Sequence, residues 1–510
     1  MGYLLGIDIG TSGTKTLLID EDGKTRAAKM IEYPLLTPHP GWAEQRPEDW
    51  WKATCESIRA VLRKSRVKPA AIKGVGFSGQ MHGSVFLDEK GKVVRPCILW
   101  CDGRTAAECD EIMRTVGPAR MHELVSNPAL AGFTAPKIVW LRNHEPDKFR
   151  RVRQILLPKD YIRYRLTGKY AAEVSDAAGT VLFDVKNRRW CDEILETLKI
   201  PRDWLPPVYE SYDVCGHVTA AAARATGLAK GTPCVGGGAD NTCGAVGSAI
   251  VVEGRVMTSL GTSGVVFAPT DTPQVDPQER LHTFCHSTRR QWYVMGCMLS
   301  AGMSLQWYRN QLGEVERAAA RRRRRDVYDL LMNQAKKMPL GAEGLFFLPY
   351  LMGERSPHKD PFARGAFIGL SFRHTKSHLV RAIVEGVTFA LRDMIEIMRD
   401  LGAKMQEVRL IAGGAKSPFW RQVVADIFGL QIVIPKNTEG PAMGAAILAG
   451  VGTELFSDFF ETTERILPVA SRVDPDDERH EQYNEIYSHF VQLYPALKGH
   501  FAEMGKVLKL

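Results

Sequence analysis

The sequence has no long hydrophobic segment. No run of about 18 apolar residues occurs, which argues against a helix that spans a membrane by itself. The first residues, MGYLLGIDIG, also lack the basic stretch, apolar stretch and small-residue cleavage site of a secretory signal. We therefore expect a cytoplasmic protein with no membrane partner.

Cysteine pairs with the spacing of a metal site or a disulfide framework are also missing. The ten cysteines are scattered singly between Cys55 and Cys297, without a CxxC pair or a histidine-rich partner motif. We expect reduced thiols, most of them buried.

Positive charge is concentrated in one place. The formal net charge is +9, and five of these charges come from residues 321–325, all arginine. The run has no interleaved aromatic residues and no recognisable nucleic-acid-binding module around it. A solvated helix or loop is therefore favoured over a nucleic-acid partner.

Nucleotide-binding motifs of two common kinds are missing or out of place. No GxxxxGK[ST] sequence occurs, which excludes a P-loop. Residues 74–79 fit GxGxxG, but this motif binds dinucleotides only where a helix follows the strand. Strand-like residues follow here, at 84–87, so we expect no dinucleotide site.

The length of the chain and the alternation of its segments predict an α/β protein with two domains. Its 510 residues exceed what a single core of about 250 to 300 residues supports. Short apolar runs alternate with longer helix-like stretches such as residues 47–64 and 378–399.

The tetrapeptide Gly-Thr-Ser-Gly occurs twice, at residues 10–13 and 261–264, each time between two strand-like runs, as in a β-hairpin. We predict two related domains, residues 1–249 and 250–510, that face each other across a cleft.

Glycine-rich turns bring backbone N–H groups close to a ligand, as phosphate binding requires. The first turn and its surroundings offer Gly10, Thr11, Ser12, Thr14 and Lys15. Asp8 ends the apolar run before this turn, where a carboxylate can hold Mg²⁺ through water. An ordinary hairpin, with an aspartate that initiates a turn, has the same local sequence.

Asp240 follows three glycines and an alanine and precedes Asn241, at a predicted strand-to-helix junction. A carboxylate there can accept the proton of an attacking hydroxyl group. A helix N-cap is the local alternative. We expect the pKa of Asp240 to be ordinary and low.

Two further segments are candidates for ligand contacts. Residues 80–83, Gln-Met-His-Gly, combine neutral donors, an apolar surface and an imidazole, as a small polyol site requires, although a lone histidine is more often structural. Residues 413–417 hold two glycines at the end of an apolar run, which allows a flat base to lie against the backbone. An ordinary strand-to-helix turn is the alternative.

Two long segments resemble the signatures of the FGGY family of carbohydrate kinases, which belongs to the actin-like ATPase superfamily. The first is residues 132–144, GFTAPKIVWLRNH, and the second runs from Gly365 to Glu385. The resemblance extends from Gly6 to at least Gly450. It implies two actin-like (ribonuclease H-like) domains with a central cleft, and phosphorylation of a sugar by ATP with Mg²⁺.

The resemblance also implies roles for individual residues. Asp240 and Asp8 are the catalytic residues, with Asp240 as the proton acceptor, and both are also the metal residues. The sugar contacts are Met81, His82, Trp100, Arg104, Asp240 and Asn241. The ATP contacts are Gly10, Thr11, Ser12, Thr14, Lys15, Gly261, Thr262, Ser263, Gly413, Gly414, Lys416 and Ser417.

Within the family, residues 79–83, 100–104, 157–161 and 175–180 are similar to the members that phosphorylate D-xylulose and differ from those that phosphorylate glycerol. Cys101 stands where these members often carry Asn, and Ala239 where Gly is usual. The alternatives are a kinase for another ketose or polyol such as ribulose, and an actin-like nucleotide-dependent switch without sugar kinase activity. A homodimer is compatible with the resemblance.

Overall fold

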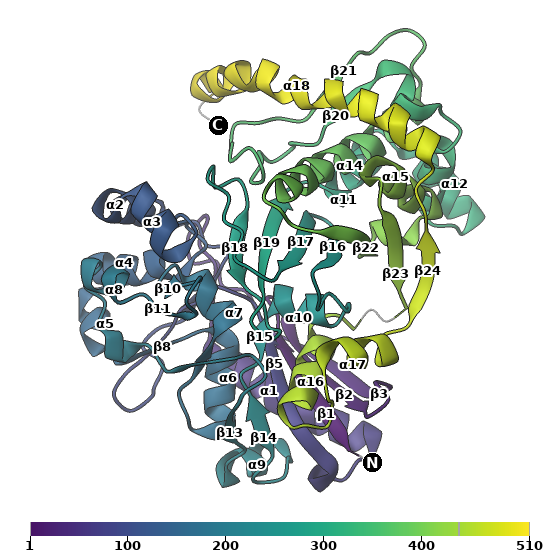
Figure 1. Ribbon diagram of the computed structural model, residues 1–510. Helices are drawn as coiled ribbons and strands as arrows, with labels where there is room; N and C mark the ends of the chain where they lie inside the picture. Colours follow the sequence, from purple (N-terminus) through teal and green to yellow (C-terminus); the bar gives the residue numbers. More distant parts are fainter. Residues whose placement is uncertain (1, 437–438, 509–510) are drawn as a thin grey trace.

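The computed structural model describes residues 2–436 and 439–508, and its two largest sheets have seven strands each (Figure 1). The first sheet contains, in spatial order, β13 (Val214–His217), β14 (Pro233–Val235), β5 (Ile72–Gly79), β1 (Tyr3–Ile9), β2 (Gly13–Asp20) and β3 (Thr25–Glu32), with β15 (Gly238–Ala239) also paired to β5. The second contains β18 (His282–Cys285), β19 (Trp292–Met298), β17 (Gly264–Thr270), β16 (Gly254–Leu260), β22 (Met405–Ile411), β23 (Gln431–Pro435) and β24 (Val469–Val473).

The two sheets share one strand order. Five neighbouring strands of one sheet match five of the other in order. They are β3-β2-β1-β5-β14 in the first sheet and β19-β17-β16-β22-β23 in the second. In each, the first two strands along the chain form an antiparallel hairpin, and a later strand pairs parallel to the first. The two Gly-Thr-Ser-Gly turns connect these hairpins, so the predicted hairpins and the predicted relationship between two α/β units are confirmed.

Helices cover the faces of both sheets, and short strand pairs lie in the connections. The helices are α1 (Pro47–Ser65), α2 (Ala106–Val116), α3 (Pro118–Val125), α4 (Thr134–His144), α5 (Pro146–Arg151), α6 (Pro158–Thr167), α7 (Val174–Ala177), α8 (Asp192–Thr197), α9 (Ala220–Thr226), α10 (Asp240–Val246), α11 (Gly302–Gln311), α12 (Glu314–Arg323), α13 (Val327–Ala335), α14 (Lys376–Asp400), α15 (Pro418–Phe428), α16 (Pro441–Gly452), α17 (Phe459–Ile466) and α18 (Asp477–Leu508). The short pairs are β4 (Glu44–Gln45) with β7 (Cys97–Ile98), β6 (Val85–Leu87) with β8 (Gln154–Leu156), β9 (Ala172–Glu173) with β12 (Val208–Tyr209), β10 (Phe183–Asp184) with β11 (Arg189–Trp190), and β20 (Phe346–Leu348) with β21 (Ala366–Ile368).

The alternation of side chains along β1 separates two cores. Leu5, Ile7 and Ile9 pack in one cluster with residues of α1 and α6, whereas Leu4 packs in a second cluster with residues of α16. Because successive side chains of a strand point to opposite faces, α1 and α16 cover opposite faces of the first sheet.

Helix α16 follows the strands of the second sheet in sequence but packs on the first sheet, where Figure 1 shows it beside β1 and β5. Glycines in both strands allow this approach. A Cβ atom on Gly76 would lie 1.8 Å from the carbonyl oxygen of Ala445, and one on Gly6 would lie 1.9 Å from that of Ala442. Residues 74–79 therefore belong to a strand that packs closely against a helix, and the chain division at residue 249 stays a prediction.

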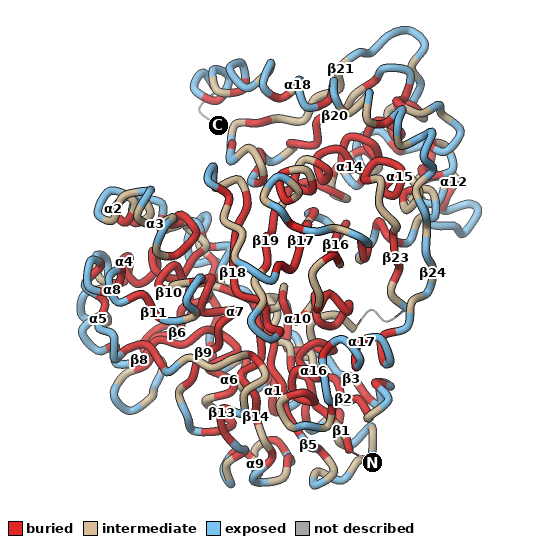
Figure 2. Tube along the Cα trace, viewed as in Figure 1, coloured by how far each residue is buried: buried red, intermediate tan, exposed pale blue. Residues whose placement is uncertain are grey.

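The buried segments gather along the two large sheets and the helices that pack on them (Figure 2). Helices α14 and α16 are buried along most of their length, whereas the five consecutive arginines at the end of α12 are exposed, as predicted for a solvated segment. All ten cysteines are free thiols and seven are buried, as expected. Within the described parts of the chain, no helix is both long enough and apolar enough to cross a membrane.

The substitution Gly76→Ala tests the contact between α16 and the first sheet. The added Cβ would collide with backbone, so we expect it to cost about 3 kcal/mol or more of unfolding free energy and to lower the urea midpoint strongly. Gly499→Ala is the matched control, because nothing lies within 4 Å of a Cβ there and the site is in helix α18. It should leave the midpoint unchanged or raise it. Equal midpoints for the two variants would contradict the close contact.

Candidate active site

Strand β5 brings two carboxylates toward each other. Asp8 of β1 pairs with Ser78 from one side of β5, and Gly238 of β15 pairs with Ser78 from the other. Asp240 follows β15 directly as the first residue of α10. The predicted catalytic residues, 232 positions apart in sequence, therefore lie at the same end of the first sheet.

The helix N-cap at this junction is Ala239, which makes no side-chain cap, so Asp240 is not the N-cap. Its Oδ1 atom accepts a hydrogen bond of 2.8 Å from the backbone N–H of Asn241. Asp8 accepts a 2.8 Å hydrogen bond from the Ser78 hydroxyl.

The expected low pKa of Asp240 is wrong. Burial, and then the nearby charge of Asp8, raise the pKa of Asp240 to about 7. Burial also raises the pKa of Asp8, against the lowering effects of Ser78 and Lys15. Both aspartates are half-buried, so their carboxylates are reachable although their surroundings are mostly protein.

The two carboxylates fit a Mg²⁺ ion. In the described part of the chain neither forms an ion pair, and no group of three or more His, Cys, Asp or Glu side chains is arranged to hold a metal. Magnesium is commonly bound by only one or two carboxylates, with water and substrate phosphates completing the octahedron. Two half-buried carboxylates, one of which has its pKa raised by burial and by the charge of the other, are a suitable pair for such an ion.

Three of the predicted sugar contacts lie together. The Asn241 amide lies 3.6 Å from the Met81 sulfur. His82 makes a 2.7 Å hydrogen bond from Nδ1 to the carbonyl oxygen of Gly179, so Nδ1 carries the proton and Nε2 is the acceptor of the neutral ring. Burial lowers the pKa of His82 to about 3, which keeps the imidazole neutral.

Lys137 was not predicted as a site residue, although it belongs to the first family signature. Its ammonium group is fully buried and donates hydrogen bonds of 2.8 Å to the carbonyl oxygens of His82 and Gly132. His82 has a left-handed backbone, with φ of 67°. Lys137 therefore holds the His82 carbonyl in a conformation that a non-glycine residue rarely adopts.

Of two other predicted sugar contacts, Trp100 lies beside the first hairpin, whereas Arg104 is enclosed by acidic side chains. The Trp100 indole N–H donates a 3.0 Å hydrogen bond to the Thr11 hydroxyl, and its side chain is 43% exposed. The Arg104 guanidinium instead pairs with Asp102 and Glu44, and its side chain is 1% exposed. All of these partners are protein groups, so the predicted sugar contact of Arg104 is not supported by this geometry.

Only some of the residues predicted to contact phosphate from the first hairpin turn are accessible to a ligand. Ser12 at the tip is exposed, whereas Thr14 is fully buried in β2, so a contact between the Thr14 hydroxyl and phosphate is not supported. Lys15 forms a 2.5 Å ion pair with Glu439, just before α16. Gly10 closes the turn through a 3.0 Å hydrogen bond to the Gly13 carbonyl.

A cavity of about 510 Å³ lies in the second unit. Six of the seven residues predicted there to contact ATP line it, namely Gly261, Thr262, Gly413, Gly414, Lys416 and Ser417. The volume is within the range of about 300 to 1,000 Å³ that small-molecule sites occupy. Ser417 also caps α15 by accepting the Trp420 N–H at 3.3 Å, so the strand-to-helix turn and the cavity wall are the same segment.

Four polar side chains that line this cavity were not predicted. Gln306, Asp326, Tyr328 and Asp329 line it from α11, α13 and the N-cap of α13. Asp326 directly follows the arginine run at residues 321–325, and no local sequence motif there pointed to a ligand site.

Comparisons with known proteins agree with this arrangement. The family model described as "FGGY family of carbohydrate kinases, N-terminal domain" matches residues 3–247, and the model of the C-terminal domain matches residues 256–453. The chain belongs to the FGGY family of carbohydrate kinases. As a family member it is a two-domain, actin-like sugar kinase, and its nucleotide substrate is ATP.

Similar proteins cover the chain almost completely. A protein named xylulose kinase from Escherichia coli (strain K12) is 40% identical over 494 residues, 97% of this chain and 99% of the relative. A protein of the same name from Bacillus subtilis (strain 168) is 39% identical over 98% of this chain and 99% of its own. A crystal structure of a "xyloylose kinase" from Brucella ovis has a TM-score of 0.90 at 36% identity, covering 98% of this chain and 99% of that one.

The role of Lys137 in this sugar kinase can be tested with Lys137→Met. The His82 and Gly132 carbonyls would lose a donor, so we expect a lower unfolding free energy, by about 1 to 3 kcal/mol. The sugar KM should rise about tenfold, which corresponds to about 1.4 kcal/mol, while the ATP KM changes little. Lys169→Met, at an exposed position, is the control and should change none of these values. An unchanged sugar KM for Lys137→Met would contradict the proposed support of His82.

Proposed function

We propose that this kinase transfers the γ-phosphoryl group of ATP to the terminal hydroxyl group of D-xylulose, giving D-xylulose 5-phosphate and ADP. The observation that carries the proposal is the placement of Asp240 beside Asp8, with Met81 and Asn241 in contact next to it. The relatives named xylulose kinase, which match nearly the whole chain, support the choice of sugar.

In this mechanism the C5 hydroxyl oxygen attacks the γ-phosphorus in line with the β,γ-bridging oxygen. The new oxygen–phosphorus bond forms, the bond to the bridging oxygen breaks, and ADP leaves. Asp240 orients the hydroxyl group and accepts its proton. Because such transition states are loose, positioning and neutralisation of charge supply most of the rate enhancement.

Asp8 and Asp240 would hold Mg²⁺, which supplies neutralisation of the phosphate charge when it is bound. Gly10, Thr11, Ser12 and Lys15 approach the phosphates from the first unit, and residues 261–263 approach them from the second. The cavity beside residues 413–417 takes the nucleotide base. Met81, His82, Trp100, Asn241 and Asp240 enclose the sugar. We exclude Arg104 and the Thr14 side chain from direct contact, because both are buried among protein groups.

We place this reaction in the cytoplasm and assign it two small-molecule ligands, the sugar and ATP. The absence of a membrane-crossing helix from residues 2–436 and 439–508 is compatible with this location. A homodimer stays a prediction.

The sugar specificity can be measured by coupled detection of ADP with ATP and Mg²⁺. We expect kcat/KM for D-xylulose to exceed that for D-ribulose, L-ribulose, xylitol and glycerol, and no-sugar ADP release to be slow. If kcat/KM were highest for ribulose, the sugar kinase activity would stand and the preferred substrate would be ribulose. ADP release that does not depend on any sugar would contradict the proposed function.

The role of Asp240 predicts both a rate and a pH dependence. Asp240→Asn should lower kcat about 10² to 10⁴-fold, the usual contribution of a general base. In the wild type, kcat/KM should rise with pH up to about 7 and then level off, because the pKa of Asp240 is raised to about 7 and the base must be unprotonated. The residual activity of Asp240→Asn should lack this rise.

Asp393→Asn is the matched control for this experiment. Asp393 of α14 is another aspartate whose pKa burial raises to about 7, and it accepts a 2.6 Å hydrogen bond from Tyr487. Its substitution should leave kcat and the pH profile unchanged. A pH profile that is flat between pH 5.5 and 8 in the wild type would contradict proton acceptance by Asp240 with this pKa.

A further inference from the structure

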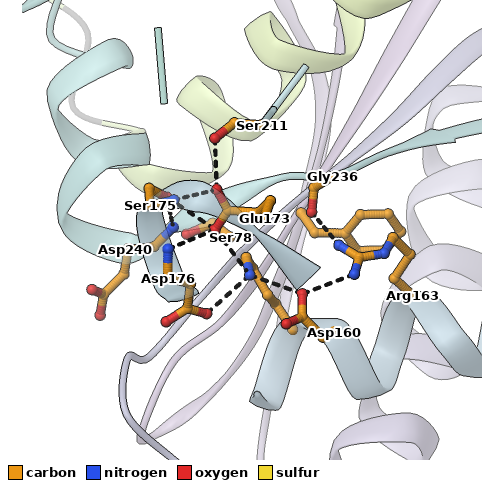
Figure 3. Close-up of polar contacts among 12 residues, drawn as sticks. Ser78, Asp160, Arg163, Glu173, Ser175, Asp176, Ser211, Gly236 and Asp240 are labelled. Carbon is orange, nitrogen blue, oxygen red and sulfur yellow. Dashed lines mark hydrogen bonds and ion pairs between the residues drawn. The ribbon is translucent and has the colours of Figure 1, made fainter. Parts of the chain in front are cut away.

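A dense group of charged side chains is buried near Asp240 (Figure 3). The Lys159 ammonium group lies 2.9 Å from Asp160, 2.9 Å from Asp176 and 3.2 Å from Glu173. Arg163 lies 3.0 Å from Asp160 and also donates to the Gly236 carbonyl. All five side chains are at most 1% exposed.

Such a cluster is weak evidence for stability. Charges removed from water lose hydration that their mutual attraction only partly restores, and apolar replacements of the same volume are often as stable. A cluster of this kind is more readily explained by the groups that it holds in place.

Glu173 has the most complete set of partners in the cluster. Its carboxylate accepts hydrogen bonds from the backbone N–H groups of Ser175 and Asp176, both at 2.8 Å, and thereby caps α7. It also accepts from the hydroxyl groups of Ser175 at 2.9 Å and Ser211 at 2.7 Å. With Lys159 as a fifth neighbour, the position of this carboxylate is determined from several directions.

Ser175 connects Glu173 to the segment that carries Asp240. Its hydroxyl donates to Glu173 and accepts the backbone N–H of Ala239 at 3.0 Å. Ala239 is the residue before Asp240. The Thr242 hydroxyl, in the first turn of α10, lies 3.2 Å from the same oxygen and donates to the Ala239 carbonyl at 2.9 Å.

The Ser287 hydroxyl also reaches the start of α10, since it lies 2.6 Å from the Thr242 hydroxyl and 3.1 Å from that of Ser175. The helix has seven residues and its N-cap, Ala239, has no side chain that could cap it. The hydroxyl of Ser175 takes the place of a local cap by binding the Ala239 N–H from another part of the chain.

The same segment also contacts the sugar side of the site. Gly179, four residues after Ser175, accepts the Nδ1 proton of His82. A Cβ on Gly179 would lie 2.7 Å from the His82 ring and 3.0 Å from the Met81 methyl group. Residues 173–179 therefore lie between the acidic and the sugar-binding parts of the site and contact both.

We propose that Ser175, held by Glu173, is a positioning residue for phosphoryl transfer that fixes the orientation of the Asp240 carboxylate. This inference deepens the proposed function and rests on it. Ser175 touches neither substrate in this arrangement and acts through the backbone of Ala239. Its contribution should appear in the chemical step, because small displacements of a reacting group reduce rate much more than binding.

The variant Ser175→Ala tests the proposal. We expect kcat to fall about 10 to 100-fold, while the KM values for sugar and ATP change by less than about threefold. In the Asp240→Asn background, Ser175→Ala should lower kcat by less than about twofold, because the group that it positions is already gone. Equal losses in both backgrounds, or a loss confined to KM, would overturn the proposal.

Ser211→Ala is the matched control. It removes the other hydroxyl donor to Glu173, at the same depth, but among the described residues its hydroxyl has no hydrogen bond to Ala239 or α10. It should lower the melting temperature about as much as Ser175→Ala and leave kcat within about twofold of the wild type. Equal effects of the two serine variants on kcat would indicate a general structural role and contradict positioning.

A second variant covers the case in which Ser175→Ala does not fold. Thr242→Val removes the hydroxyl that approaches Ser175 from α10 and keeps the shape of the side chain, so it should lower kcat with unchanged KM values in the same way. The assays use whichever acceptor the sugar panel identifies. A different preferred sugar would change the wild-type profile, whereas failure of the positioning role would appear only in the ratios of variant to wild type.

Discussion

The close contact between helix α16 and its neighbours is the constraint on which both halves of the active site depend. Backbone meets backbone where α16 crosses β1 and β5, and again where it meets α10, since a Cβ on Gly444 would lie 1.8 Å from the Cys243 carbonyl oxygen. Helix α10 begins with Asp240, and Glu439 before α16 pairs with Lys15. One helix from the second half of the chain thus determines where Asp240 and the first hairpin lie.

The same crossing explains why glycine recurs at these positions. A glycine in a strand normally weakens it, because the residue has no side chain to pack and loses more conformational freedom on folding. At Gly6 and Gly76 this cost is offset by contact between the sheet and the α16 backbone, which no other residue type permits. The two chain halves are therefore mechanically coupled close to the reacting groups.

The pKa of Asp240 is set by its burial in the folded protein more than by its neighbours along the sequence. Asp8 and Asp240 lie near each other, and neither forms an ion pair among the described residues, whereas three nearby carboxylates surround Lys159. Burial also raises the pKa of Asp176 in that group. The carboxylates in this region thus have two environments. Those around Lys159 are paired with cations, whereas those of Asp8 and Asp240 are open to a metal and a substrate.

Much of the architecture was predictable from the sequence because it rests on short-range patterns. The repeated Gly-Thr-Ser-Gly turns, the helix around residues 378–399, the strand that carries Asp8 and the strand that ends before Asp240 follow from periodicity and turn chemistry. What was missed, what was wrong and what this geometry does not support all depend on neighbours that are distant in the sequence. Arg104 is enclosed by ion pairs, and Lys137 reaches a carbonyl 55 residues away. The raised pKa of Asp240 comes from the surrounding protein.

The amino-acid sequence by itself therefore determined the family, the two related α/β units and the residue types available for chemistry, since these depend on local spacing and on patterns of apolar residues. The tertiary structure alone decided which of those residues meet, how deeply each carboxylate is buried and what holds Asp240 in place. The reason is physical. Desolvation, charge pairing and hydrogen-bond geometry depend on the distances between atoms, and for residues far apart in the sequence these distances are set only when the chain folds.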